Sequence, residues 1–122
     1  LMSWAGILPY HYSGQTLPPR NISPLLIPLY QNLRTLCATP FNHIVLNLYR
    51  DGRDHIALHA DNEPELGPNP LIAAISLGAP RKFILRHKNR KYKGGKQKIT
   101  LHHGSLLVMG GDFQHRWRHS QR

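Results

Sequence analysis

The sequence predicts a mainly β fold, a sandwich or roll of short strands with one helix packed outside it. Three observations favour this fold class. Short stretches of alternating, β-branched or aromatic residues recur along the chain, glycine, proline and asparagine separate them, and a single stretch has helical spacing. With 122 residues, the chain has the length of one domain.

The first part of the chain contains two predicted strands and the helix. Residues 4–12 alternate weakly and are rich in aromatic side chains, which indicates a strand or an extended arm. Four prolines within residues 17–28 exclude a continuous regular element there. Apolar residues then follow helical spacing over 25–37, and residues 41–49 have the β-branched and aromatic composition of a strand.

The second part of the chain predicts a succession of strands divided by turns. The run 71–77 is almost continuously apolar, which is typical of a strand covered on both faces, and the basic, glycine-bearing stretch 89–98 indicates the tip of a hairpin. The other predicted strands are residues 55–61, 81–88, 99–101, 105–109 and 113–120.

The charge balance points to an anionic partner. Sixteen lysines and arginines stand against six acids, and the formal net charge of +10 favours nucleic acid over the alternative, an anionic membrane. No apolar run approaches the roughly 20 residues of a spanning helix, so we expect an intracellular protein, nuclear in a eukaryote and cytoplasmic in a bacterium. The single cysteine, Cys37, excludes an internal disulfide and a multi-cysteine zinc site.

A histidine and a carboxylate two residues apart, His59 and Asp61, form the first candidate site. Residues i and i+2 point to one face of a strand, so both side chains could reach one metal ion. A later histidine, such as His115 or His119, would complete a His, Asp, His set with open coordination positions, as in non-haem Fe(II) oxygenases. Five of the six acids lie within residues 51–65, where their negative charge would favour the binding of a cation. The alternative is that the pair only hydrogen-bonds internally or to the backbone.

Two further pairs with this spacing have both a functional and a structural interpretation. Asn47 and Tyr49 either hold a ligand, or Asn47 caps a bulge while Tyr49 reaches solvent. Tyr10 and Tyr12 either form a stacking surface for a flat base or are ordinary half-buried strand residues.

The basic stretch around the predicted hairpin tip also has two interpretations. Its cations either contact phosphate groups or form a solvated surface. The cations that we consider are Arg86, Lys88, Arg90, Lys91 and Lys93.

Seven longer segments are more specific than the His-x-Asp pair. They are YHYSG at 10–14, NLYRDG at 47–52, HADNEPEL at 59–66, SLGAPRKF at 76–83, RHK at 86–88, HGSLLVM at 103–109 and WRHS at 117–120. In this order and spacing the chain, from about residue 10 to residue 120, resembles the AlkB family of Fe(II)- and 2-oxoglutarate-dependent nucleic-acid dealkylases. The resemblance is nearest to its double-stranded-DNA repair branch.

The resemblance implies a double-stranded β-helix, a jelly-roll-like core, with one or two packed helices. It implies that His59, Asp61 and His119 bind Fe(II), with His119 taken from the segment WRHS, in which it follows the aromatic Trp117 by two positions. His115 then has no ligand role. Asn47 and Tyr49 match family positions that hold 2-oxoglutarate.

The resemblance also implies a substrate and a reaction. Tyr10 and Tyr12 match positions that shape the pocket for a flipped, methylated base, with the His59 ring on the other side and Glu63 near the base edge. The implied enzyme uses O2 and 2-oxoglutarate to hydroxylate the N-methyl group of bases such as 1-methyladenine or 3-methylcytosine in DNA or RNA, and formaldehyde is then lost. The basic stretch would hold phosphates without reading sequence.

The family's C-terminal strand carries an arginine that pairs with the distal carboxylate of 2-oxoglutarate, in a segment similar to Arg-x-Asn-x-Thr-x-Arg, and the 122 residues do not include it. We therefore expect residues 1–122 to be a single, monomeric dioxygenase-like domain that is incomplete at both ends. The alternatives are an oxygenase of this fold that acts on a protein or small molecule, and a nucleic-acid-binding module without catalysis.

Overall fold

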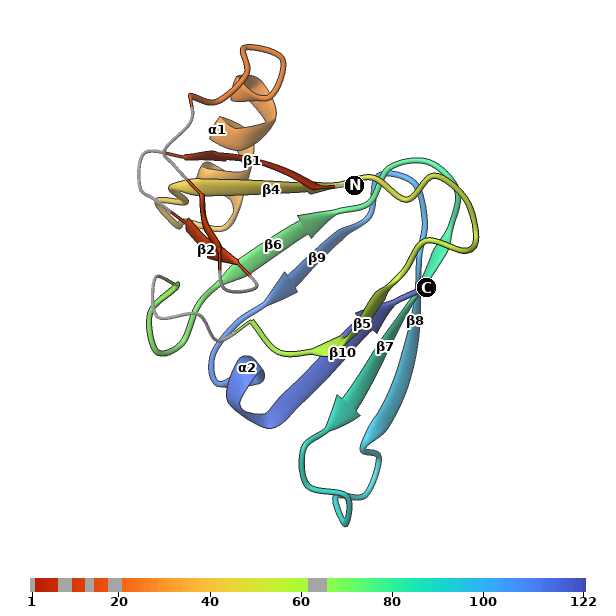
Figure 1. The fold of residues 1–122 in the computed structure, drawn as a ribbon. Coiled ribbons are helices and arrows are strands. Elements are labelled where there is room, and N and C mark those ends of the chain that lie inside the picture. Colours follow the sequence, from red (N-terminus) through yellow and green to blue (C-terminus); the bar gives the residue numbers. More distant parts are fainter. Residues whose placement is uncertain (1, 7–9, 13–14, 18–20, 62–65) are drawn as a thin grey trace. The chain divides into compact units, whose positions relative to one another are not determined.

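The computed structural model describes all residues except 1, 7–9, 13–14, 18–20 and 62–65 (Figure 1). The described part is mainly β with antiparallel strand pairs, which confirms the predicted fold class. The chain divides into two units, Leu1–Leu48 and Tyr49–Arg122, and each is described by itself. None of the described helices is long and apolar enough to cross a membrane.

The first unit contains two antiparallel strand pairs. Strand β1 (Met2–Gly6) pairs with β4 (His43–Asn47), although about forty residues separate them in the sequence. Strand β2 (Tyr10–Tyr12) pairs with its neighbour β3 (Gln15–Leu17). The stretch 4–12, predicted as a strand or an arm, therefore contributes to two different pairs.

Helix α1 (Ile27–Leu36) lies within the predicted range 25–37 and begins where the prolines end. Pro28 is in its first turn, where the missing N–H removes no helical hydrogen bond. The Tyr30 hydroxyl donates a hydrogen bond to the Phe41 carbonyl, which joins the helix to the segment that leads into β4.

The second unit contains two sheets. One has the strand order β5-β10-β7-β8 and the other pairs β6 with β9 (Figure 1). The elements are β5 (Ile56–His59), β6 (Ile72–Ile75), β7 (Arg81–His87), β8 (Lys96–Leu101), β9 (Leu106–Met109), α2 (Phe113–Arg116) and β10 (Trp117–Gln121). The last strand lies between the first strand of this unit and β7, so residues far apart in the sequence become neighbours.

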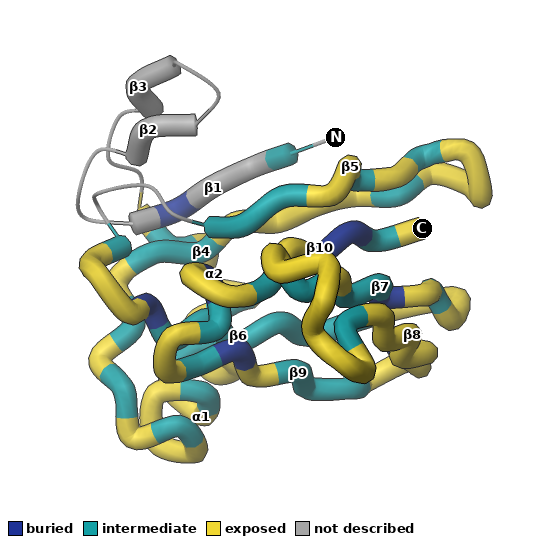
Figure 2. Tube along the Cα trace, turned by 90° about the horizontal axis from the view of Figure 1, so that it is seen from below, coloured by how far each residue is buried: buried dark blue, intermediate teal, exposed yellow. Residues whose placement is uncertain are grey.

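The core of the second unit lies on one face of the four-stranded sheet. Phe83, Leu101 and Met109 are buried there, and half-buried apolar side chains such as Ile72 and Phe113 pack against them. Figure 2 shows the trace of the chain coloured by burial, with short buried stretches between intermediate and exposed ones. Along β7, the buried Phe83 alternates with the exposed Lys82, as period-two geometry requires. This alternation divides the sheet into an apolar face and a polar face.

Three predictions of local structure need correction. The run 71–77 was predicted as a strand covered on both faces, but all four residues of β6 are only half-buried, so neither face of β6 is fully covered. Strand β5 ends at His59, two residues before the predicted end. Residues 113–116, predicted as strand, form the helical turn α2, in which the Asp112 carbonyl accepts hydrogen bonds from the backbone N–H groups of His115 and Arg116.

Candidate metal centre

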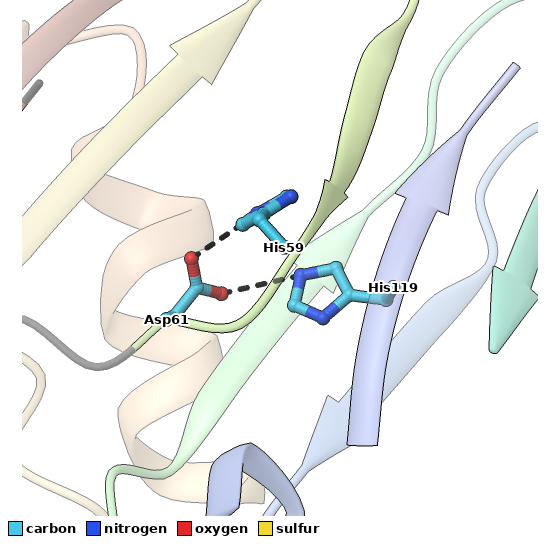
Figure 3. Close-up of side chains that lie close together, drawn as sticks. All are labelled: His59, Asp61 and His119. Atoms are coloured by element: carbon cyan, nitrogen blue, oxygen red, sulfur yellow. Dashed lines mark ion pairs between the residues drawn. The ribbon is translucent and has the colours of Figure 1, made fainter. Parts of the chain in front are cut away.

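Three side chains converge in the second unit (Figure 3). The Asp61 carboxylate lies between two imidazoles, with Oδ1 3.4 Å from His59 Nε2 and Oδ2 3.3 Å from His119 Nε2. One candidate ligand atom from each residue lies within 4.8 Å of the other two. The structure thus brings together the three residues for which the sequence predicted a common role.

Strand pairing places the two histidines side by side. His59 of β5 is directly opposite His119 of β10, and the two ring centroids are 4.3 Å apart. Directly opposed residues of antiparallel strands point to the same face. The register shifts between His119 and Gln121, so the regular pairing of β10 with β5 is interrupted just beyond the site.

Asp61 reaches the site from outside the strand. The prediction used the i, i+2 spacing of a strand, but β5 ends at His59 and Asp61 follows in irregular backbone. Its backbone N–H donates a hydrogen bond of 2.7 Å to Gln114 Oε1, which fixes the chain at this point. The predicted neighbours are correct, whereas the predicted local conformation is wrong.

Each histidine ring is held in a defined orientation. His59 Nδ1 lies 2.8 Å from the Ala57 carbonyl oxygen, so this nitrogen carries the proton and Nε2 is left to face Asp61. The His119 ring is 5% exposed and stacks on Phe83 at 5.3 Å between centroids. Within the described part of the chain, the buried His119 Nδ1 has no hydrogen-bond partner.

Asp61 is ionised at neutral pH. Its partial burial acts to raise the pKa of the carboxyl, but the hydrogen bonds and charges of His119 and His59 outweigh that effect and hold the pKa well below its usual range. The site therefore offers one anionic oxygen and two imidazole nitrogens on neighbouring positions.

This donor set fits Fe(II). Two imidazoles and one carboxylate form the facial triad of non-haem iron oxygenases, which leaves positions for other ligands. Ligand atoms about 2.1 Å from a metal and at right angles to each other are about 3.0 Å apart. The histidines face different oxygens of Asp61, and one ligand atom from each of the three residues lies within 4.8 Å of the others, so metal binding would draw these atoms closer together. The Ala57 carbonyl supplies the outer hydrogen bond that metal-bound histidines ordinarily have.

Gln114 is a positioning residue that the sequence did not reveal. It is 2% exposed, it accepts the Asp61 N–H, and its Nε2 lies 3.8 Å from the sulfur of Met109. A glutamine between Phe113 and His115 gives no periodic signal, because its function depends on a contact 53 residues away in the sequence.

We expect Gln114→Leu to weaken metal binding by about tenfold, because substitutions in the outer shell of a metal site typically cost about 10- to 100-fold in affinity. The variant leaves the Asp61 N–H without its acceptor while keeping a side chain of similar size. Titration with Fe(II) or Mn(II) under anaerobic conditions measures the change. Gln97→Leu, an exposed change on β8, is the matched control and should bind metal like the wild type.

The two residues predicted to hold 2-oxoglutarate are placed differently. Tyr49 is half-buried, its hydroxyl donates to Gln121 Oε1 at 3.3 Å, and the Arg81 guanidinium lies 4.4 Å from its ring centroid. Asn47 is an exposed residue at the end of β4 in the first unit. Tyr49 therefore does not simply reach solvent, as the alternative interpretation had it.

Some predicted substrate residues cannot be placed by their side chains. Tyr10 and Tyr12 belong to β2, but their side chains are not described, and Glu63 lies outside the described residues. The predicted roles of these three residues stay predictions.

The basic stretch forms the predicted hairpin between β7 and β8. Tyr92 stacks on His87 with ring centroids 4.0 Å apart, which orders the tip. The Lys88 ammonium donates to the Gln114 carbonyl at 2.9 Å, so this cation is engaged within the protein. All five cations of this stretch are exposed, and the four besides Lys88 are Arg86, Arg90, Lys91 and Lys93.

His115, the competing candidate for the third ligand, lies in α2. Its Nε2 contacts the Pro68 carbonyl rather than the triad. The choice of His119 over His115, which composition alone left open, agrees with this geometry.

The sequence of the chain matches a known protein family. The family model of the 2OG-Fe(II) oxygenase superfamily matches residues 2–122, and the chain therefore belongs to this superfamily. Membership confirms the predicted jelly-roll-like core, and Fe(II), 2-oxoglutarate and O2 are the cofactors of the family.

Individual relatives place the chain near the AlkB proteins, as predicted. It is 39% identical to alpha-ketoglutarate-dependent dioxygenase alkB homolog 3 of Bos taurus over 126 residues, which cover 98% of this chain and 44% of that protein. It is 38% identical to DNA oxidative demethylase ALKBH2 of Homo sapiens, covering 93% of this chain and 45% of that protein. It is 34% identical to DNA oxidative demethylase ALKBH2 of Arabidopsis thaliana, covering 96% of this chain and 42% of that protein. The chain thus spans less than half the length of these relatives.

Proposed function

We propose that this chain contains the iron site of a 2-oxoglutarate-dependent dioxygenase that removes alkyl groups from nucleic-acid bases by oxidation. The observation that carries the proposal is the convergence of His59, Asp61 and His119, from β5, the segment after it and β10. Membership of the 2OG-Fe(II) oxygenase superfamily supports it.

The three residues would hold the metal from one side. When bound, Fe(II) supplies the oxidation, with 2-oxoglutarate and O2 as co-reactants. His59 is oriented by the Ala57 carbonyl and His119 by the Phe83 ring, so the protein fixes the ligands before the metal arrives.

For the cosubstrate we propose Asn47 and Tyr49, on the strength of the resemblance of the segment NLYRDG. The Tyr49 hydroxyl can donate a hydrogen bond to a carboxylate, and its ring is held by Arg81.

For the substrate we propose an N-alkylated base such as 1-methyladenine or 3-methylcytosine, in DNA or RNA. Such a base carries positive charge and pairs poorly, which lowers the cost of flipping it by up to a few kcal/mol. Tyr10, Tyr12 and the His59 ring would contact the base, and Glu63 would attract its charge. The exposed cations of the hairpin, Arg90 among them, would contact phosphates.

The test is product release from a methylated oligonucleotide. The full-length protein, with Fe(II), 2-oxoglutarate and O2, is expected to release formaldehyde and succinate in equal amounts from an oligonucleotide that contains 1-methyladenine. The same oligonucleotide without the methyl group is the control and should give no formaldehyde. Turnover of 2-oxoglutarate on a protein or small molecule, with none on the oligonucleotide, would replace this proposal by the alternative oxygenase.

A further inference from the structure

The strand register brings six cations to one face of the sheet formed by β10, β7 and β8. Arg118 is directly opposite Arg86, and Arg86 is directly opposite Lys96, so three cations form a row across three strands. In the next row, Ser120 and Lys98 flank Ile84. The six cations of this basic face are Lys82, Arg86, Lys96, Lys98, Arg118 and Arg122.

The third row contains Lys82, which exchanges two backbone hydrogen bonds with Arg122, of 3.1 and 3.0 Å, and is opposite Thr100. All six cations are exposed. Opposed residues share a face, so the exposed cations surround the half-buried Ile84 and the buried Ser120 on an area about 14 Å long and about 10 Å wide.

The basic face is the reverse of the face that carries the candidate metal site. Neighbouring residues of a strand point to opposite faces, so Arg118 points away from the side to which His119 points. Likewise, Lys82 and the buried Phe83 point to opposite faces of the sheet. A ligand of the basic face therefore does not occupy the iron site.

The charge of this face is not compensated within the described part of the chain. No described carboxylate forms an ion pair with any of the six cations, because the described acids pair elsewhere. These acids are Asp51 with Arg53, Asp54 with Arg50, Asp61 with the two histidines, and Asp112 with Arg116. Like charges directly opposite each other destabilise a sheet, so a row of three cations is best explained by an anionic ligand that they share.

We propose that the basic face binds the phosphate backbone of a nucleic-acid duplex, as a second contact surface separate from the iron site. A duplex strand carries one charge per about 3.4 Å, so about four phosphates of one strand fit along a face of this length. Exposed apolar side chains, which insert into a membrane interface, do not occur among the nine residues of the three rows. The surface needs neither iron nor a methylated base, so it goes beyond the proposed function.

The experiment measures binding of an unmethylated, fluorescently labelled duplex to the full-length protein without metal, over a series of salt concentrations. The triple variant Lys96→Gln, Lys98→Gln, Arg118→Gln is expected to reduce the slope of log Kd against log salt by about three, one per lost phosphate contact. A charge-preserving variant, Lys96→Arg, Lys98→Arg, Arg118→Lys, controls for folding and should keep the wild-type slope.

An unchanged slope in the neutral triple variant overturns the proposal. So does a loss of binding to anionic phosphatidylserine vesicles with no change for the duplex, because the face then serves a membrane. The readout is independent of the proposed function. If the wild type releases formaldehyde but the neutral triple variant keeps the wild-type salt slope, only the proposed role of the basic face is refuted. If the triple variant has a reduced slope but the wild type shows no turnover, only the proposed enzymatic function is refuted.

Discussion

Replacing Asp61 with alanine is expected to abolish iron binding and lower formaldehyde release by at least about 100-fold, since even changes in the outer shell of a metal site cost about 10- to 100-fold. The carboxylate is the anionic member of the triad and contacts both imidazoles, at 3.4 and 3.3 Å. Without it, His59 and His119 lie with ring centroids 4.3 Å apart and with no anion between them.

Metal-dependent thermal stability gives a readout that does not require turnover. A metal that binds only the folded state stabilises it by about 2.7 kcal/mol at a hundredfold excess over Kd. The wild type should therefore gain thermal stability with Fe(II) or Mn(II), and Asp61→Ala should not. Without metal, Asp61→Ala is expected to be somewhat less stable than the wild type at neutral pH, because the interactions with His119 and His59 that hold the pKa of Asp61 low also stabilise the folded state.

The matched control for Asp61→Ala is Asp54→Ala. Asp54 is likewise a hydrogen-bonded carboxylate whose pKa is held well below its usual range by the hydrogen bonds from Arg50. It lies outside the triad, so Asp54→Ala should bind iron like the wild type. Equal metal stabilisation of wild type and Asp61→Ala would contradict the assignment of the site.

The sequence predicts that two of the three converging side chains lie close together, because these two residues carry a local signal. His59 and Asp61 lie two residues apart, and their neighbourhood holds most of the acids. The predicted cause of their proximity, the spacing within one strand, is nevertheless wrong. Strand β5 ends at His59, and a hydrogen bond to the buried Gln114 positions Asp61. Two residues that are two apart in the sequence stay close in space whether the backbone between them is a strand or an irregular segment.

The third candidate ligand and the basic face could not be predicted from local sequence patterns. Periodicity cannot choose between His115 and His119, and only the longer resemblance did so. The row Arg118, Arg86 and Lys96 depends on the register of three strands, and register is set by side-chain packing across the sheet rather than within one strand. A count of charges predicts an anionic partner but cannot show which face binds it.

Residues 113–116 show why a short segment gives an ambiguous pattern. The two aromatic residues Phe113 and Trp117 lie four apart, which fits both a strand and a helical turn, and their rings stack at 6.4 Å between centroids. Over four residues the two periods cannot be distinguished. The Asp112 carbonyl, which accepts two backbone N–H groups, decides in favour of the turn.

Phe83→Ala is expected to destabilise the protein by about 3 to 5 kcal/mol, the usual cost of removing a buried aromatic ring. The ring is 5% exposed and lies in the core with Leu101 and Met109. Domains of this size are stable by only about 5–15 kcal/mol, so the loss is a large part of the total. Urea unfolding measures it as a fall in the midpoint at constant slope.

The same substitution links the core to the metal site, because the Phe83 ring stacks on His119 at 5.3 Å. Phe83→Leu, which fills most of the space, should cost less stability and still weaken metal binding in the folded protein, since His119 loses its stacking partner. Val108→Ala, at a side chain that is 46% exposed, is the control and should change stability by less than about 0.5 kcal/mol. If Phe83→Leu binds metal like the wild type, then the triad is positioned by the strand register of β5 and β10 alone, and the aromatic packing serves only the core.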